Sequence, residues 1–315
     1  MSTKSRVSLE KTNSTNSHLQ VEEPFFASIL RKTSSKTLAV LQAGRLHNSL
    51  SLASVGIIGL FASNVLLPSI LPYLLAWTVL FLGIYFINDY FDCSIDTINK
   101  PWKPIPSGRL QADTLYHLGI LFLIGGALLV IITLDSVGLN LTAGSVAAIT
   151  SAYLGFEYSR WIKKDSPLFG DTIISLTVAI CFLLPWIAGI NVNTDYLFSL
   201  PIFTIALLGR EYLKDLEDRD ADIKGSRITF PIHYGTYTTI TTAAILVAGS
   251  IIWSLYLIFS IPNQGGLRFI PFVLFSIISL IFLQKNDIAR AQGWLKPALM
   301  FHLLAELIYW GYYCE

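Results

Sequence analysis

Charged residues are missing from four long stretches of the chain, and these stretches define its architecture. No Asp, Glu, Lys or Arg occurs in residues 46–88, 114–134, 136–156 or 172–194. Because a membrane-spanning helix needs about 20 predominantly apolar residues, the first stretch predicts two helices and each of the others predicts one. Asn64, Pro68 and Pro72 suit the turn that would divide the first stretch.

Four weaker apolar segments follow and complete the pattern. They cover residue 196 into a second acidic cluster, then about 236–260, 269–284 and 295–313. We therefore predict an all-α polytopic membrane protein, in which residues 46–315 form nine transmembrane helices around a central cavity. Residues 1–45 would be a separate N-terminal part. Its beginning, rich in Ser, Thr and Asn, reads as a disordered tail, and residues 25–45 would lie along the membrane surface.

Composition agrees with a membrane protein and excludes an ordinary soluble enzyme. The 315 residues are 53% hydrophobic and 14% charged, whereas soluble domains carry about 25% charged residues. Threading nine spans from a cytoplasmic N-terminus puts nearly all the loop cations on the cytoplasmic side, and only Arg268 on the other. The net charge of +1 hides this polarity. No glycine-rich nucleotide loop is present, and neither a nucleic-acid partner nor an obligate protein partner is indicated.

Two acidic clusters stand where apolar stretches end. In the first, Asn88, Asp92 and Asp96 recur every four residues and would share one helix face. In the second, Glu211, Asp215, Asp218 and Asp222 would share a face in the same way. Carboxylates at helix C-termini are disfavoured by the helix dipole, and the Lys and Arg nearby in sequence are too few to offset them. Mg²⁺ fits this pattern, because it binds one or two carboxylates together with the phosphates of a substrate.

Basic loops follow both clusters, and another joins the fourth and fifth predicted spans. The loop after the first has three prolines in six residues, so it cannot continue a helix and would form a stiff loop at the membrane surface. The cations of these loops are Lys100, Lys103, Arg109, Arg160, Lys163, Lys164, Lys224 and Arg227. Carboxylates that hold a metal, beside cations that grip phosphoryl oxygens, form a site typical of polyphosphate substrates.

These motifs resemble those of a known family. Asn-Asp-x-x-Asp-x-x-x-Asp at residues 88–96, with a Pro-Ser-Gly loop behind it, is similar to the first signature of the UbiA superfamily of intramembrane prenyltransferases. Asp-x-x-x-Asp at residues 218–222 is similar to the second. Within the superfamily the motifs look most like those of digeranylgeranylglyceryl phosphate synthases, then chlorophyll synthases and homogentisate prenyltransferases. Ser94 and Ala221 depart from the common forms, but neither replaces an expected ligand.

The resemblance implies a Mg²⁺-dependent transfer of a polyprenyl group from a prenyl diphosphate to a small aromatic or glycerol-phosphate acceptor, beside membrane lipid. It implies magnesium ligands at Asn88, Asp92, Asp218 and Asp222. It implies catalytic carboxylates at Asp89, Asp92, Asp96, Asp215, Asp218 and Asp222. It implies contacts to the diphosphate from Lys103, Arg109, Tyr158, Lys163, Lys164, Lys214 and Lys224.

Two other functions are compatible with parts of the pattern. A terpene cyclase of the same fold would use the same diphosphate site without an acceptor. A cation transporter would need polar groups and broken helices near the middle of the membrane, whereas here the acids lie at one edge and the spans are mostly uninterrupted. The sequence disfavours the transporter and leaves transferase and cyclase open.

Overall fold

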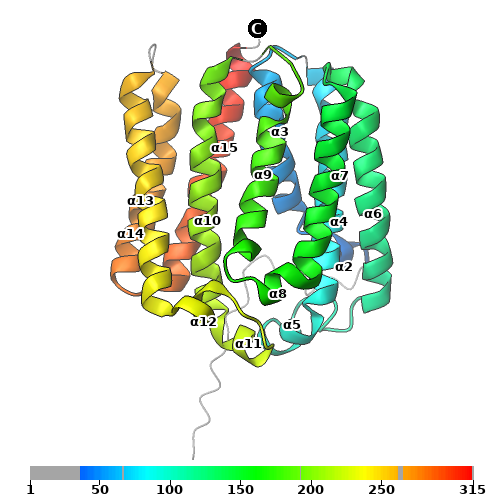
Figure 1. The fold of residues 1–315 in the computed structure, drawn as a ribbon, viewed down its shortest axis with the longest axis vertical. Helices are drawn as coiled ribbons and strands as arrows, with labels where there is room; N and C mark the ends of the chain where they lie inside the picture. The colour runs from blue at the N-terminus through cyan, green and yellow to red at the C-terminus, as the bar shows by residue number, and fades with distance from the viewer. Residues whose placement is uncertain (1–35, 66, 192, 262–264, 314–315) are drawn as a thin grey trace, which may run out of the picture.

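The protein is an all-helical bundle in which long helices stand side by side (Figure 1). The computed structural model describes residues 36–65, 67–191, 193–261 and 265–313, so most of the predicted N-terminal tail lies outside the described residues. The α-helices are α2 (Lys36–Ala43), α3 (Leu46–Phe61), α4 (Leu67–Phe91), α5 (Cys93–Asn99), α6 (Ala112–Thr133), α7 (Leu141–Glu157), α8 (Lys163–Asp165), α9 (Phe169–Ile187), α10 (Leu200–Glu217), α11 (Arg219–Lys224), α12 (Phe230–Tyr234), α13 (Thr236–Ser260), α14 (Ile270–Gln284) and α15 (Ile288–Tyr313). Short 3₁₀ segments are η1 (Asp135–Val137), η3 (Thr194–Ser199) and η4 (Gly265–Phe269), and η2 (Tyr158–Ile162) is a π-helical turn.

Nine of the described helices have 15 residues or more, and they correspond to the nine predicted spans. Five segments among them are long and apolar enough to cross a membrane by length and composition alone, and α3 is apolar but shorter. Two boundaries differ from expectation. Pro72 lies inside α4, one turn past the chain reversal, and α15 begins seven residues before the predicted start.

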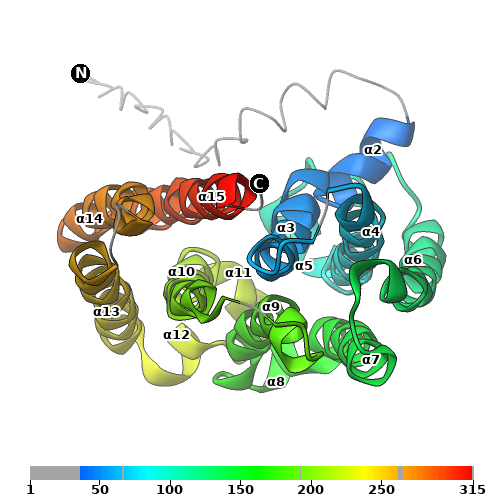
Figure 2. The same ribbon diagram turned by 90° about the horizontal axis from the view of Figure 1, so that it is seen from above.

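The helices form two groups, seen from above in Figure 2. One core is built from α3, α4, α6, α7 and α9, and the other from α10, α13, α14 and α15. A third cluster, with Ile58 of α3, Phe182 of α9, Phe203 of α10 and Trp310 of α15, joins them. The first acidic motif lies at the end of α4, in the first group. The second lies at the end of α10, in the other group. Packing between the two groups therefore determines how the motifs face each other.

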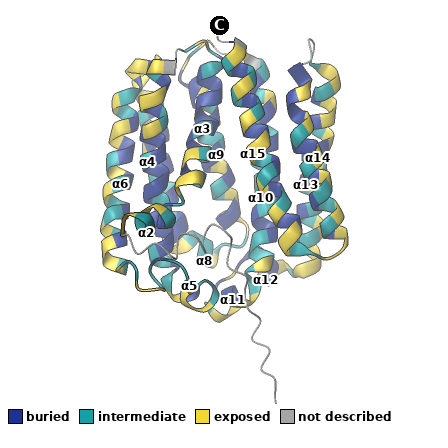
Figure 3. Ribbon diagram, turned by 180° about the vertical axis from the view of Figure 1, so that it is seen from behind, coloured by how far each residue is buried: buried dark blue, intermediate teal, exposed yellow. Residues whose placement is uncertain are grey.

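The outer helices carry many exposed residues (Figure 3), and a large number of these are big apolar side chains. Ile132 of α6 is 72% exposed and Phe259 of α13 is 86% exposed. A water-exposed surface of this kind would be unfavourable, whereas hydrocarbon accepts it without cost. The surface therefore matches a protein embedded in lipid.

Glycines bring α4 and α6 into close contact. A Cβ atom on Gly126 would lie 2.5 Å from the backbone nitrogen of Leu80, and one on Gly83 would lie 2.6 Å from that of Leu123. Small residues at such crossings let backbones approach where no hydrophobic driving force exists between helices and lipid. This packing fixes α4, and with it the position of the first acidic motif.

A buried ion pair holds the end of the bundle remote from the motifs. Arg268 of η4 donates to Glu306 of α15 at 2.8 Å, and Glu306 also accepts from Ser199 and Trp310 at 2.7 and 2.9 Å. The side chains of Arg268 and Glu306 are 3% and 0% exposed. Arg268, the one cation that the sequence placed on that side, is thus a structural residue inside the protein.

His302 does not pair with Glu306, although the two lie one turn apart. Its ring packs against Phe203, Phe269 and Phe272, with centroids 4.7 to 5.8 Å away. Glu306 instead points to the loop segments, where Arg268 and Ser199 meet it.

Removing one partner of this pair should destabilise the protein strongly. Glu306→Ala leaves the Arg268 guanidinium buried without a counterion, which costs about 3 kcal/mol or more. We expect a clear fall in the Tm of the detergent-solubilised protein. The double variant Arg268→Met/Glu306→Leu should recover most of the loss, because apolar residues need no counterion. An unchanged Tm for Glu306→Ala would show that the pair does not support the fold.

Candidate active site

Both acidic motifs line a single cavity of about 310 Å³ at one end of the bundle. The short helices α5 and α11, which follow the motif helices α4 and α10, pack against each other at that end (Figure 1). The cavity wall also includes residues of α3, α7, α9 and α15. Segments far apart in the chain therefore contribute side chains to one site.

The first motif keeps its helical register although α4 ends at Phe91. Asp92 donates its backbone N–H to the carbonyl of Asn88 at 2.9 Å, and Asp96 donates to Asp92 at 2.8 Å. The four-residue spacing therefore continues across the break between α4 and α5. As a result Asn88, Asp92 and Asp96 all line the cavity, while Asp89, one position off this face, is absent from the lining.

The second motif repeats this device at the end of α10. The backbone N–H of Asp218 bonds to the carbonyl of Lys214 at 2.9 Å, and that of Asp222 bonds to Asp218 at 3.0 Å. Glu211, Asp215, Asp218 and Asp222 all line the cavity. The shared helix faces expected from the sequence are therefore present in both motifs.

One arginine joins the two motifs. Arg227 donates to Asp222 at 3.2 Å and makes a second, shorter contact with Asp92. The two carboxylates thus lie within reach of a single guanidinium group. Lys163 of α8 approaches from another wall and donates to Asp92 at 2.6 Å and to Asn88 at 3.3 Å.

The proline-rich loop supplies further cations. Lys103 donates to Asp89 at 2.9 Å and to Asp96 at 2.6 Å. Lys100 contacts Asp218 of the other motif at 2.9 Å. The stiff loop therefore reaches both motifs.

Some of these cations come from distant parts of the sequence. The Lys and Arg near each motif were expected to be too few to offset the carboxylates, and Lys163, Lys100 and Arg227 reach Asp92 or Asp218 from 71, 118 and 135 positions away. The folded protein thus provides charge compensation that local sequence could not reveal.

Electrostatics keep the central carboxylate ionised. Burial alone would raise the pKa of Asp92, but Lys163 and Arg227 outweigh it and hold that pKa well below its usual range. For Lys163, burial lowers the pKa of the ammonium group more than the attraction of Asp92 raises it. Burial likewise raises the pKa of Asp222 despite the opposing effect of Arg227. The site is a set of mutually dependent charges.

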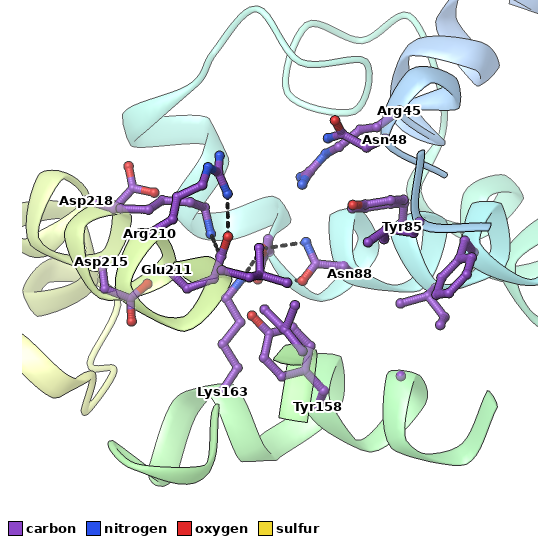
Figure 4. A pocket seen from close by; sticks show the side chains of 18 of the residues that line it. Arg45, Asn48, Tyr85, Asn88, Tyr158, Lys163, Arg210, Glu211, Asp215 and Asp218 are labelled. Atoms are coloured by element: carbon purple, nitrogen blue, oxygen red, sulfur yellow. Dashed lines mark hydrogen bonds and ion pairs between the residues drawn. The ribbon is translucent and has the colours of Figure 1, made fainter. Parts of the chain in front are cut away.

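Several expected diphosphate contacts lie in the cavity wall. They are Lys103, Tyr158, Lys163 and Lys214. Tyr158 occupies the π-helical turn η2, a local distortion that is common at functional sites. Its ring lies 5.8 Å from the Lys163 ammonium group (Figure 4).

Three other expected contacts are not in the wall. Arg109 folds back and donates to Gln42 at 2.8 Å. Lys164 lies over the ring of Phe91 at 5.7 Å, because it neighbours Lys163 and points to another side. Lys224 is exposed beyond the end of the second motif.

Residues outside the proposed set also line the cavity. They are chiefly Arg45, Asn48, Tyr85, Lys100, Arg210, Glu211, Arg227 and Lys296. Arg45 precedes α3, within the stretch assigned to the N-terminal part, and it donates to Asp89 at 3.0 Å. Arg45, Arg210 and Lys296 each lie at the edge of an apolar stretch in the sequence. An ionisable residue in such a position often has a functional role, so this position was the signal that could have identified them.

The oxygen donors of the site fit a hard cation. The described residues contain no preformed cluster of three or more His, Cys, Asp or Glu ligands. However, Oδ1 of Asn88 and Oδ2 of Asp92 already converge on one positive atom, the Nζ of Lys163. Amide and carboxylate oxygens are ligands that Mg²⁺ accepts. A metal ion at the position of this Nζ atom would have both oxygens as ligands.

Comparison with known proteins agrees with this architecture. Residues 49–305 match the UbiA prenyltransferase family. A digeranylgeranylglyceryl phosphate synthase of Saccharolobus solfataricus is 31% identical over 293 residues, which are 85% of this chain and 95% of that protein.

Solved structures share the fold. One concerns digeranylgeranylglyceryl phosphate synthase in membranes; it is 26% identical, with a TM-score of 0.65 over 88% of this chain and 99% of that one. A UbiA homologue from Archaeoglobus fulgidus bound to GPP and Mg²⁺ is 17% identical, with a TM-score of 0.64 and coverage of 88% and 99%. The chain therefore belongs to the UbiA prenyltransferase family and is a multi-pass membrane enzyme that transfers prenyl groups.

Proposed function

We propose that this enzyme transfers a geranylgeranyl-type chain from its diphosphate to a glycerol-phosphate acceptor, with Mg²⁺. The main support for this proposal is that Arg227 donates hydrogen bonds to both Asp92 and Asp222, one carboxylate from each motif. Carboxylates held together in this way suit a ligand that contacts both motifs at once. The named relatives are digeranylgeranylglyceryl phosphate synthases, which supports this choice of substrates.

The diphosphate would bind between the motifs, with Asn88, Asp92, Asp218 and Asp222 as the metal ligands. When bound there, Mg²⁺ neutralises part of the diphosphate charge and makes it a better leaving group. Lys163 and Lys103, now paired with carboxylates, would exchange these partners for phosphoryl oxygens. Asp89, Asp96 and Asp215 would orient these groups from the side. We place this end of the bundle and the N-terminus on the cytoplasmic side, where the loop cations gather.

The cavity wall away from the motifs suits the chemistry of the prenyl group. Breaking the bond between C1 of the prenyl chain and the diphosphate oxygen leaves an allylic cation. The acceptor hydroxyl oxygen then bonds to C1 and passes its proton to the released diphosphate. Phe81, Ile84 and Val178 exclude water, and the rings of Tyr85 and Tyr158 offer faces to the cation.

Both motifs should be needed for turnover. Asp92→Asn and Asp218→Asn keep the side-chain shape but remove a charge that would balance metal and diphosphate. We expect each to reduce kcat at least about 100-fold while the protein stays folded in detergent. Asp113→Asn, which changes an exposed carboxylate near the same end of the bundle, serves as the control. Full turnover in EDTA, or in either motif variant, would refute the proposed site.

The acceptor requirement separates a transferase from a cyclase. Purified protein is incubated with geranylgeranyl diphosphate and Mg²⁺, alone and with phenolic acids or glycerol-phosphate lipids. We expect a prenylated product only with a glycerol-phosphate acceptor, because the cavity has cations beyond those paired with the motifs. A cyclic hydrocarbon formed without any acceptor would replace the proposal, and a prenylated phenolic acid would correct the acceptor class.

A further inference from the structure

A second group of cations lies on the cavity side formed by α3, α10 and α15. Arg210 and Lys296 line the cavity there together with His47. Arg45 and Arg210 reach the pocket from opposite walls (Figure 4). Arg210 pairs with Glu211 of the second motif, and it is not among the cations that contact Asp92, Asp218 and Asp222.

Few carboxylates balance these cations. Glu211 alone accepts from both Arg210 and Lys214, the latter at 3.0 Å. Nε of Arg210 is buried and finds no hydrogen-bond partner in the part of the chain that the structure describes. Among the described residues, no carboxylate comes within 4.0 Å of the Lys296 ammonium group.

Lys296 lies near charges of both signs. Arg210 is the strongest single charged neighbour and repels it, while Glu217 and Glu211 attract it. Glu217 is also engaged, since its carboxylate accepts from Gln292 at 3.3 Å. Lys296 and Arg45 also lie close enough to His47 for their charges to act on it. Cations held together beside an apolar wall cost free energy unless an anion joins them.

We propose that Arg210 and Lys296 bind the phosphate group of the acceptor. This inference rests on the proposed function and adds the subsite that would select a phosphorylated acceptor over its alcohol. The motif cations would serve the diphosphate, because each already lies against a proposed metal ligand or its neighbour. Both groups line one cavity, so a hydroxyl on an acceptor held by its phosphate can face the prenyl carbon.

Steady-state kinetics on the full-length chain can test the subsite. Lys296→Gln and Arg210→Gln are compared with Lys285→Gln, an exposed lysine at the end of α14 outside the cavity wall. The probes are a prenylglyceryl phosphate and the matching prenylglycerol, with geranylgeranyl diphosphate as donor. Loss of one charged hydrogen-bond donor should raise the KM for the phosphorylated acceptor about tenfold. The KM for the donor should stay within about twofold, and the penalty should vanish with the alcohol.

Direct binding of the phosphorylated acceptor in EDTA gives a readout that does not depend on turnover. The two cavity variants should bind it about tenfold more weakly than wild type, and Lys285→Gln should bind it equally well. Inorganic phosphate should compete for this binding in wild type but not in Lys296→Gln. An equal loss for phosphate and alcohol, or a raised KM for the donor alone, would overturn the subsite while leaving the proposed function intact. A wild type that ignores the phosphorylated acceptor would instead refute the proposed function itself.

Discussion

The site depends on buried carboxylates that are kept ionised by cations from other segments. Asp92 is the centre of this arrangement, because Lys163 and Arg227 contact it from two different walls. A buried charge without a counterion costs several kcal/mol, so these contacts hold the two helical groups in one arrangement. Charge compensation therefore organises the cavity and also prepares it for a ligand that carries its own charges.

A ligand with a metal and phosphates can take over these contacts pair by pair. Lys163 already gathers an amide oxygen and a carboxylate oxygen around a positive atom, which a metal can replace. In that arrangement the ammonium group of Lys163 would have phosphoryl oxygens as partners. On the wall formed by α10 and α15, Arg210 shares the Glu211 carboxylate with Lys214, and Lys296 has no carboxylate within 4.0 Å among the described residues. An acceptor with its own phosphate would balance these two cations. Two differently charged regions of one cavity would thus hold two substrates in order.

Much of this could be predicted from sequence, for identifiable reasons. The separation of charged and apolar stretches predicted the nine long helices. The four-residue spacing of Asn88, Asp92 and Asp96 predicted that these three side chains share one helix face. Contacts between distant segments could not be predicted, because nothing local links Arg227 to Asp92 or Arg45 to Asp89. The burial of Arg268 against Glu306 was invisible for the same reason, since a lone loop cation reads as a surface residue.

A double-mutant cycle tests most directly whether the two motifs act on one ligand. The Kd of geranylgeranyl diphosphate in Mg²⁺ is measured for wild type, Asp92→Asn, Asp218→Asn and the double variant. If both motifs hold the same diphosphate, the double variant should lose little more affinity than either single variant, because the first loss already dismantles the shared site. Strictly additive losses would show two independent sites and contradict the account.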